Sequence, residues 1–233
     1  MDFLYEYQED NHYSFTLGMS LTIEALKHRP QTVKEVILSD KVKDNEFLKE
    51  LERLCFRHQI PLRTDENIIR HLSVKENCFA IAVFDKFSSE LKKEENHILL
   101  YDFIEEGNLG TTLRSAVSFN FKNIALIANQ VDLFNPKTVR ASMGAIFHCD
   151  IEIFNTIDDY LAKYPNHHLY PLLTKGKECK DVDFISPFAM ILPGCYVELD
   201  ELFKDGYSFG EHHNLSLPVY TSLSLYQAYL HTK

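Results

Sequence analysis

The sequence predicts an α/β protein in two parts, the larger of which is built on a mainly parallel β-sheet. Short apolar, β-branched runs alternate with segments of helical periodicity, which is typical of a sheet with helices on both faces. A polar, charge-rich stretch from Lys86 to Asn96 divides the 233 residues as an interdomain linker would. We therefore expect a small α/β domain over residues 1–86, a linker over 87–97 and a larger domain over 98–233.

The first domain shows both kinds of pattern in a short length. A helix is expected around Met19–Lys27, then a buried strand at Val33–Ser39. A second helix follows, because apolar residues recur at helical spacing from Phe47 to Cys55. A turn near Pro61 leads to further helix and to a closing strand, Phe79–Phe84.

The second domain begins with a strand, a glycine-bearing loop and a helix. Apolar residues mark one face of that helix from Leu109 to Val117, and Asn135-Pro136 reads as the start of another helix. The final helix is expected to open at Thr221-Ser222. Four buried strands are predicted in this part, at Ile98–Phe103, Asn123–Ala128, Ile146–Phe154 and Ala189–Leu192.

Composition and charge narrow the possible functions. The net charge of −10 counts against a strongly basic nucleic-acid binder, so any RNA contact must rely on local patches. No apolar run is long enough to span a membrane, and the acidic start does not resemble an export signal, so we expect a cytoplasmic protein. The five cysteines are odd in number and contain no CxxC pair, and the adjacent histidines of His167-His168 and His212-His213 diverge. No metal site is expected.

The first chemical motif lies between a predicted strand and helix. Asn108, Gly110 and Arg114 form N-x-G-x-x-x-R, followed at once by Ser115-Ala116. A glycine permits a tight turn near a ligand, the helix N-terminus presents amide donors to an anion, and Arg114 lies further along the helix. These residues suit the recognition of a phosphate or a ribose, although Asn and Gly at a helix start are also ordinary capping chemistry.

The second motif is more specific. The segment from Asn135 to Phe147 contains N-P-K and then V-R-A-S-M-G-A, and it resembles motif 2 of the SpoU/TrmH family of RNA ribose 2′-O-methyltransferases. The earlier N-L-G-T-T-L-R-S-A then resembles that family's motif 1, in the expected order. The segment Gly18–Leu26 is similar to the opening of the L30e-like substrate-binding domain that often precedes these enzymes.

The resemblance implies a SPOUT fold, in which a mainly parallel sheet ends in a trefoil knot, with an L30e-like RNA-binding domain before it. It implies S-adenosylmethionine as the cofactor, ribosomal or transfer RNA as the substrate and a homodimer, with no DNA or membrane partner. Asn108 and Arg114 would be catalytic, and Arg140, Ser142 and Lys137 would contact the substrate. The cofactor would be bound by Gly144, Leu192, Gly194, Leu217 and Ser224.

The implied chemistry requires the site to activate a ribose 2′-hydroxyl and align it with the donor methyl. Because an arginine rarely gives up its proton, Arg114 is expected to act by charge and hydrogen bonding, or as a base with help from the substrate phosphate. The competing interpretation is that Arg114 and Arg140 only pair with acids such as Glu105 or Glu106.

The third motif of the family is eroded in this chain. Pro193 and Cys195 replace the expected Gly and Glu, Glu198 replaces a second Gly, and Ser224 replaces an Asn. Gly194 would restore backbone freedom through a shifted register. Two hypotheses follow: an active RNA ribose 2′-O-methyltransferase, or a catalytically silent, dimeric module of the same fold that binds RNA or a protein.

Overall fold

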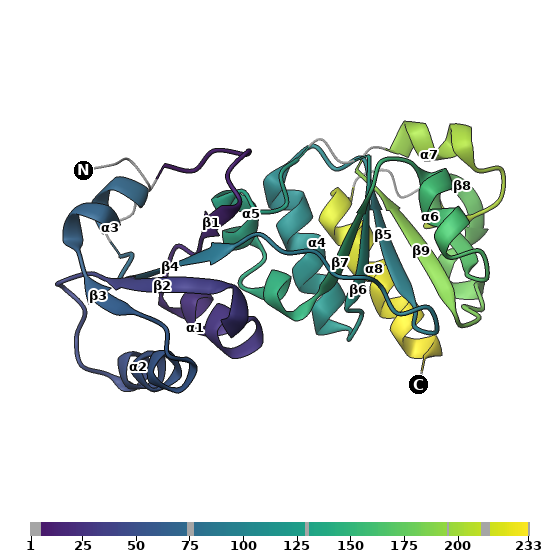
Figure 1. Ribbon diagram of the computed structural model, residues 1–233. Coiled ribbons are helices and arrows are strands. Elements are labelled where there is room, and N and C mark those ends of the chain that lie inside the picture. The colour runs from purple at the N-terminus through teal and green to yellow at the C-terminus, as the bar shows by residue number, and fades with distance from the viewer. Residues whose placement is uncertain (1–5, 74–76, 129–130, 195, 211–214, 233) are drawn as a thin grey trace. The chain divides into compact units, whose positions relative to one another are not determined.

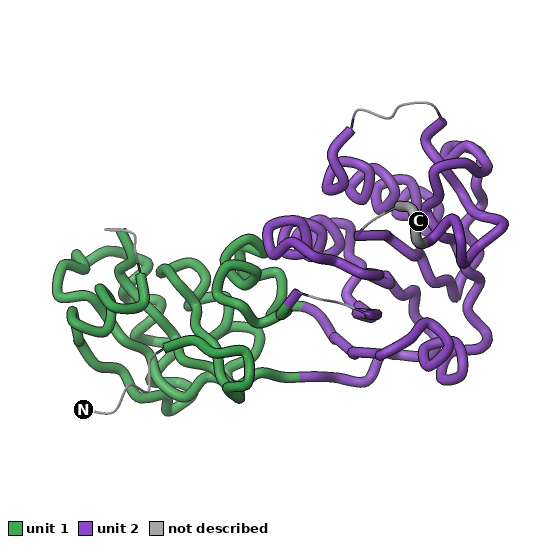
Figure 2. The backbone as a smooth tube through the Cα atoms, turned by 90° about the horizontal axis from the view of Figure 1, so that it is seen from above, with its two compact units in different colours: residues 1–87, 132–148 green, residues 88–131, 149–233 purple. Residues whose placement is uncertain are grey.

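A computed structural model describes residues 6–73, 77–128, 131–194, 196–210 and 215–232. The chain forms two compact units, which Figure 2 shows in separate colours. The first unit contains residues 1–87 and 132–148, and the second contains residues 88–131 and 149–233. The chain therefore passes between the units after Phe87, Val131 and His148. The sequence analysis expects residues 132–148 within the C-terminal domain, whereas their contacts place them in the first unit.

The first unit is built on a four-stranded sheet with the order β1-β4-β2-β3. β4 is antiparallel to both of its neighbours, and β2 is parallel to β3. Its core includes Phe15, Ile37, Ile81 and Ile69. The strands are β1 (Tyr13–Phe15), β2 (Val33–Leu38), β3 (Leu62–Thr64) and β4 (Ala80–Asp85), and the helices are α1 (Met19–His28), η1 (Pro30–Thr32), α2 (Glu46–His58) and α3 (Glu66–Leu72).

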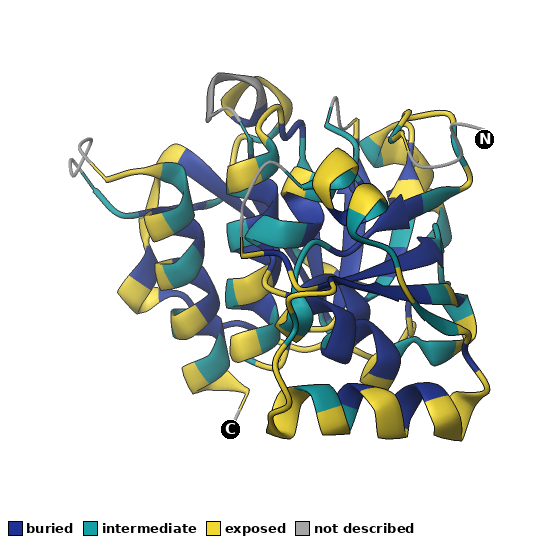
Figure 3. Ribbon diagram, turned by 90° about the vertical axis from the view of Figure 1, so that its left-hand side faces the viewer, coloured by how far each residue is buried: buried dark blue, intermediate teal, exposed yellow. Residues whose placement is uncertain are grey.

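Two helices of this unit begin at side-chain caps. Asn45 accepts a hydrogen bond from the Leu48 amide at the start of α2, and Asp65 accepts from the amides of Asn67 and Ile68 at the start of α3. Figure 3 shows that the strands are buried while the helices carry exposed outer faces. This unit is a small α/β domain, as predicted, and its likeness to L30e stays a prediction.

The segment from Asp132 to His148 is anchored in the first unit by aromatic packing. It contains the short helix α5 (Pro136–Ala141) and the 3-10 turn η2 (Ala145–His148). The ring of Phe147 lies 5.1 Å from that of Phe84, and the ring of Phe134 lies 5.1 Å from that of Phe87. This burial explains why the segment leaves the body of the C-terminal domain.

The second unit is a six-stranded, wholly parallel sheet with the order β10-β8-β9-β5-β6-β7. The central strand β5 lies between β6, the next strand in the sequence, and β9, which follows it by about 90 residues. The strands are β5 (His97–Tyr101), β6 (Asn123–Ile127), β7 (Asp150–Phe154), β8 (His168–Glu178), β9 (Phe188–Pro193) and β10 (Tyr207–Ser208). The helices are α4 (Glu106–Ser118), α6 (Ile157–Lys163), η3 (Cys179–Asp181), α7 (Tyr196–Leu202) and α8 (Leu217–His231).

Helices cover both faces of this sheet (Figure 1). On one face, Leu99, Ala125 and Ile191 of adjacent strands pack with Tyr160 of α6 and Leu199 of α7. α4 and α8 lie together on the other face. Buried residues at nearly every position of β5, β6 and β9 match the continuous apolar runs in the sequence.

Several predicted elements differ from those observed. Residues 146–154 are not one strand, because η2 ends at His148 and β7 begins at Asp150. α8 begins at Leu217 rather than at Thr221, since Pro218 fits the first turn of a helix. The eleven-residue strand β8 is not predicted at all. No helix among the described residues is long and apolar enough to cross a membrane.

Candidate functional site

The carboxyl ends of β5, β6 and β9 meet at one edge of the parallel sheet, the usual place for ligand sites in such sheets. Two residues at this edge have left-handed backbone conformations although they are not glycines. Asp102 follows β5 with φ of 51°, and Ala128 follows β6 with φ of 52°. Such strain is costly and concentrates at functional sites, which makes this edge the candidate site.

Motif 1 forms the start of α4, directly after β5. Asn108 donates a hydrogen bond from Nδ2 to Glu105 Oε2 at 3.0 Å, so its amide helps to order the first turn. Arg114 lies six residues further along, about 9 Å up the helix axis. Its side chain is exposed, and it forms no ion pair with any residue that the structure describes. The alternative in which Arg114 pairs with Glu105 or Glu106 is therefore not seen.

The helix of motif 1 is joined to the helix that carries the last part of motif 3. Ser115 Oγ lies 2.8 Å from Ser222 Oγ, and Thr112 Oγ1 lies 3.3 Å from Thr221 Oγ1. Ser224 is fully buried, and its hydroxyl donates to the Tyr220 carbonyl within α8. α8 is thus held against α4 by hydroxyl pairs, and Ser224 lies in mid-helix rather than at a cap.

Gly194, directly after β9, packs against the backbone at the end of β5. Its amide donates to the Tyr101 carbonyl at 2.6 Å. A Cβ atom at this position would meet the backbone of Asp102 and would lie 2.6 Å from Phe103 Cα, so only glycine fits. Leu192, two residues earlier, is fully buried and pairs with Leu100 in the sheet. Cys195 and the His212-His213 pair lie outside the described residues.

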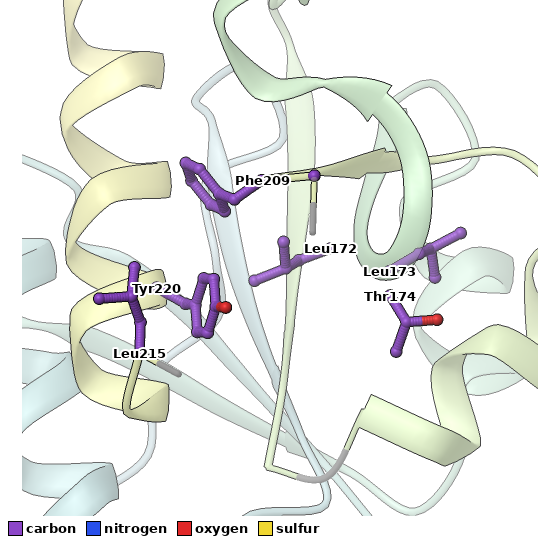
Figure 4. A pocket seen from close by; sticks show the side chains of 7 residues that line it. Leu172, Leu173, Thr174, Phe209, Leu215 and Tyr220 are labelled. Atoms are coloured by element: carbon purple, nitrogen blue, oxygen red, sulfur yellow. The ribbon is translucent and has the colours of Figure 1, made fainter. Parts of the chain in front are cut away.

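A cavity of about 120 Å³ lies between β8 and the start of α8. Its walls are mainly apolar, and the rings of Phe209 and Tyr220 form a tilted pair in its wall, with centroids 5.6 Å apart (Figure 4). Thr174 is held by Asp200 of α7, which accepts from the threonine amide at 3.0 Å. The lining residues are Leu172, Leu173, Thr174, Phe209, Gly210, Leu215 and Tyr220.

The sequence analysis missed this cavity, because none of its lining residues belongs to a recognisable motif. Of the predicted cofactor residues, Leu217 is its nearest neighbour in sequence, two positions from Leu215. Pro218 was the one residue in the sequence that could have indicated part of this cavity. A proline favours the first turn of a helix, so it marks the start of α8 and places Tyr220 in or next to that turn.

The predicted substrate residues of motif 2 lie in the first unit. Asn135 caps α5 by accepting from the Lys137 amide at 2.9 Å, as its sequence predicts, and the Lys137 side chain is exposed. Arg140 is half-buried near Cys78. Burial raises the pKa of the Cys78 thiol, and the positive charge of Arg140 acts in the opposite direction. Arg140 forms no ion pair with a described residue.

Ser142 and Gly144 have structural surroundings of their own in the same unit. Ser142 is fully buried, and its hydroxyl donates to the Val139 carbonyl at 2.7 Å. Gly144 has φ of 88° and lies against Glu24 of α1. The Ser142 hydroxyl is therefore already bonded within its own segment, and Gly144 is the point of close approach between that segment and α1.

Known proteins resemble this chain both in sequence and in fold. Residues 95–192 match the model of the SpoU rRNA Methylase family. A Bacillus subtilis protein, 23S rRNA (guanosine(2553)-2′-O)-methyltransferase RlmP, is 29% identical over 135 residues, which are 58% of this chain. That match covers 51% of RlmP, so the chain spans about half the length of this curated relative.

Solved structures resemble nearly the whole chain. The AdoMet-bound rRNA methyltransferase of Sinorhizobium meliloti has a TM-score of 0.77 and 20% identity, covering 95% of this chain and 88% of the other. The SpoU methyltransferase AviRb of Streptomyces viridochromogenes has a TM-score of 0.76 and 15% identity, with coverage of 94% and 89%. At this level of identity the likeness concerns the fold.

Proposed function

Residues 95–192 are a SpoU-family methylase segment, and from this premise we propose that the protein is an RNA ribose 2′-O-methyltransferase that uses S-adenosylmethionine. The predicted trefoil-knot SPOUT fold with a mainly parallel sheet is confirmed by the likeness to solved SpoU methyltransferases. The observation that carries the proposed activity is the exposed Arg114, which has no ion pair with a described residue and lies on α4, the helix that follows the strained end of β5.

The cavity beside α8 is the proposed place of the cofactor's base. Its leucines and its two aromatic rings suit an adenine ring, which binds by apolar contact and stacking. Its volume of about 120 Å³ is below the ~300 Å³ of small ligand pockets, so it accounts for one ring system rather than the whole cofactor. S-adenosylmethionine supplies an electrophilic methyl group when bound.

The remaining proposed cofactor contacts come from the ends of β9 and α8. Leu192 and Gly194 would contribute their backbone, and Leu217 would lie at the mouth of α8. Gly144 is proposed as a cofactor contact only because motif 2 resembles that of the SpoU/TrmH family. Ser224 is buried with its hydroxyl bonded in its own helix, so it would support the site by packing rather than by contact.

Arg114 is proposed to act on the ribose hydroxyl through its charge. A guanidinium with no carboxylate partner can bind the phosphate next to the target ribose and stabilise the oxygen as its proton leaves. Asn108 would hold the first turn of α4 through Glu105 and would orient the substrate with its amide. Both residues lie on one rigid helix, which keeps their spacing fixed.

RNA is proposed to be recognised by the first unit, acting as an L30e-like domain. Because the chain is acidic overall, the contact would depend on local cations. Lys137 and Arg140 are the proposed ones, since the Lys137 side chain is exposed and Arg140 has no ion pair with a described residue. Ser142 would shape α5 from within, because its hydroxyl is already bonded.

A homodimer through α8 is part of the proposal. Four large apolar side chains, at a spacing of four, three and four residues, form an exposed stripe along this helix. That spacing keeps them on one face, which suits packing against a second apolar helix face. The stripe residues are Val219, Leu223, Tyr226 and Leu230.

The proposed location is the cytoplasm, where a bacterial ribosomal or transfer RNA substrate would be found. Four cysteines among the described residues are buried and are not joined by a disulfide bond, which suits a reducing compartment. These are Cys55, Cys78, Cys149 and Cys179.

The second candidate is a catalytically silent, dimeric module of the same fold. The observation in its favour is the eroded motif 3 together with a cavity smaller than a typical ligand pocket. Such a module would bind RNA or a protein without transferring a methyl group.

Calorimetric titration with S-adenosylmethionine separates the two candidates. The enzyme is expected to bind one cofactor per chain. Phe209→Ala, which removes a wall of the cavity, should weaken binding at least tenfold, whereas Phe56→Ala on the exposed face of α2 should leave it unchanged. The absence of heat at millimolar cofactor would favour the silent module.

A further inference from the structure

We propose that Glu24, His28 and His148 form a binding site for a divalent transition-metal ion of the Zn²⁺ type. All three residues belong to the first unit, and one ligand atom from each lies within 4.8 Å of the other two. None of the three belongs to the proposed cofactor cavity or to motif 1, and the proposal does not depend on methyl transfer.

The geometry gathers two imidazoles around one carboxylate. His148 Nε2 lies 2.6 Å from Glu24 Oε2, and His28 Nε2 lies 3.6 Å from the same oxygen. The two imidazole rings have centroids 3.7 Å apart and are tilted by 34°. Two nitrogen donors and an oxygen donor are therefore gathered close enough to share one metal ion.

The fold brings these residues together from distant parts of the chain. Glu24 and His28 are four residues apart on α1, so they lie on one face of the helix. His148 ends η2 and is brought to α1 by the close approach of Gly144, where a Cβ would lie 2.8 Å from Glu24 Cβ and Cγ. A side chain at Gly144 would move His148 away from its partners.

The donor set indicates which ion would bind. Two histidines and a glutamate are a frequent ligand set for Zn²⁺, with a water molecule as the fourth ligand. Ca²⁺ and Mg²⁺ prefer six or more oxygen ligands, and this cluster offers a single carboxylate. The three side chains are 24% to 39% exposed, so an ion can reach them from solvent.

Metal binding would fasten the segment that carries motif 2 to α1. The ligands tie η2, which directly follows α5 and Ser142, to the helix that opens the first unit. Because the ion would bind the folded unit and not the unfolded chain, it would raise the stability of this part of the protein.

The test is calorimetric titration of the chelator-treated full chain with ZnCl₂. One ion per chain is expected, with affinity reduced at least tenfold in His28→Ala and in His148→Ala. His58→Ala is the matched control, because His58 is an exposed histidine near the end of α2 and should leave the affinity unchanged. Equal affinity in the wild-type protein and the His28→Ala/His148→Ala double variant, or no saturable binding at micromolar zinc, would overturn the proposal.

Two further measurements guard against loss of fold and adventitious binding. Co²⁺ should give the absorption bands of a four-coordinate site in the wild-type protein and not in the double variant. ZnCl₂ should raise the melting temperature of the wild-type protein and leave that of the double variant unchanged. A Zn²⁺-induced rise of the same size in both proteins would contradict the proposed ligands.

Discussion

Gly194 and Asp102 are in backbone contact at the edge of the sheet where β9 and β5 end, and this contact leaves no space for a Cβ atom at position 194. The same Asp102 has a left-handed backbone conformation, with φ of 51°. The chain turns sharply as it leaves β5, and Gly194 after β9 packs against that turn. This contact fixes the position of the turn that leads into α4, the helix that carries Arg114.

Gly194→Ala is expected to destabilise the protein by about 1–3 kcal/mol, because the added methyl group can be accommodated only by moving the Asp102–Phe103 backbone. Urea denaturation measures the change. The matched control is Gly107→Ala in the first turn of α4, where a Cβ meets nothing within 4 Å and a helix gains about 0.5–1 kcal/mol from the substitution. Equal stabilities of the two variants would contradict the close contact.

Acid is expected to destabilise the second unit through His97. Burial lowers the pKa of His97 from 6.5 to about 4, while its ring bonds to the Tyr160 hydroxyl and the Lys92 carbonyl, both at 2.9 Å. The unfolded chain therefore takes up this proton first, and the free energy of unfolding falls as the pH drops from 6.5 toward 4. Above pH 6.5 the contribution of His97 is fully present.

Urea denaturation across this pH range checks the effect. His97→Gln should show a smaller loss of stability between neutral and acidic pH than the wild-type protein, and the exposed His58→Gln should show the wild-type slope. An unchanged slope in His97→Gln would exclude His97 as the source of the acid sensitivity.

Leu223→Glu is expected to convert a dimer into a monomer, because it places a charge in the middle of the apolar stripe on α8. Light scattering coupled to size-exclusion chromatography measures the mass. Phe56→Glu, on another exposed apolar position, should keep the wild-type mass. A wild-type protein that is already monomeric would refute the proposed homodimer.

The strands β5, β6 and β9 of the second unit and the capped helix α5 could be predicted because local sequence determines them. β5 and β6 are continuous apolar runs, and α5 begins at Asn135 and Pro136, whose side chain and fixed φ suit a helix start. Gly194 was named for its backbone freedom in the eroded third motif, but its close approach to Asp102 was not predicted, because the end of β5 that it meets is about 90 residues away in the sequence.

Other features depend on contacts that no local pattern contains. Residues 132–148 join the first unit because Phe134 and Phe147 pack on rings of Phe84 and Phe87, which are about 50 residues or more distant in sequence. β8 was missed because its last five residues are exposed and lack strand alternation. The Glu24, His28 and His148 cluster could not be predicted, because His148 is 124 residues from Glu24 in the sequence and only the fold brings them together.

Arg114→Lys is expected to lower the rate of methyl transfer at least tenfold while leaving cofactor binding and stability unchanged. Lysine keeps the positive charge but loses the planar, bidentate donor geometry that suits a phosphate. The exposed side chain forms no ion pair with a described residue, so the substitution should not disturb the fold. A full transfer rate in this variant would remove the guanidinium from the mechanism.

The most direct test of the proposed function is the transfer of a radiolabelled methyl group from S-adenosylmethionine to ribosomal or transfer RNA, followed by alkaline hydrolysis. A ribose 2′-O-methyl group blocks cleavage of the next phosphodiester bond. We expect label in alkali-resistant dinucleotides with the wild-type protein and none with Arg114→Ala. Label that appears only in mononucleotides, or no transfer by a wild-type protein that binds the cofactor, would contradict the proposed function.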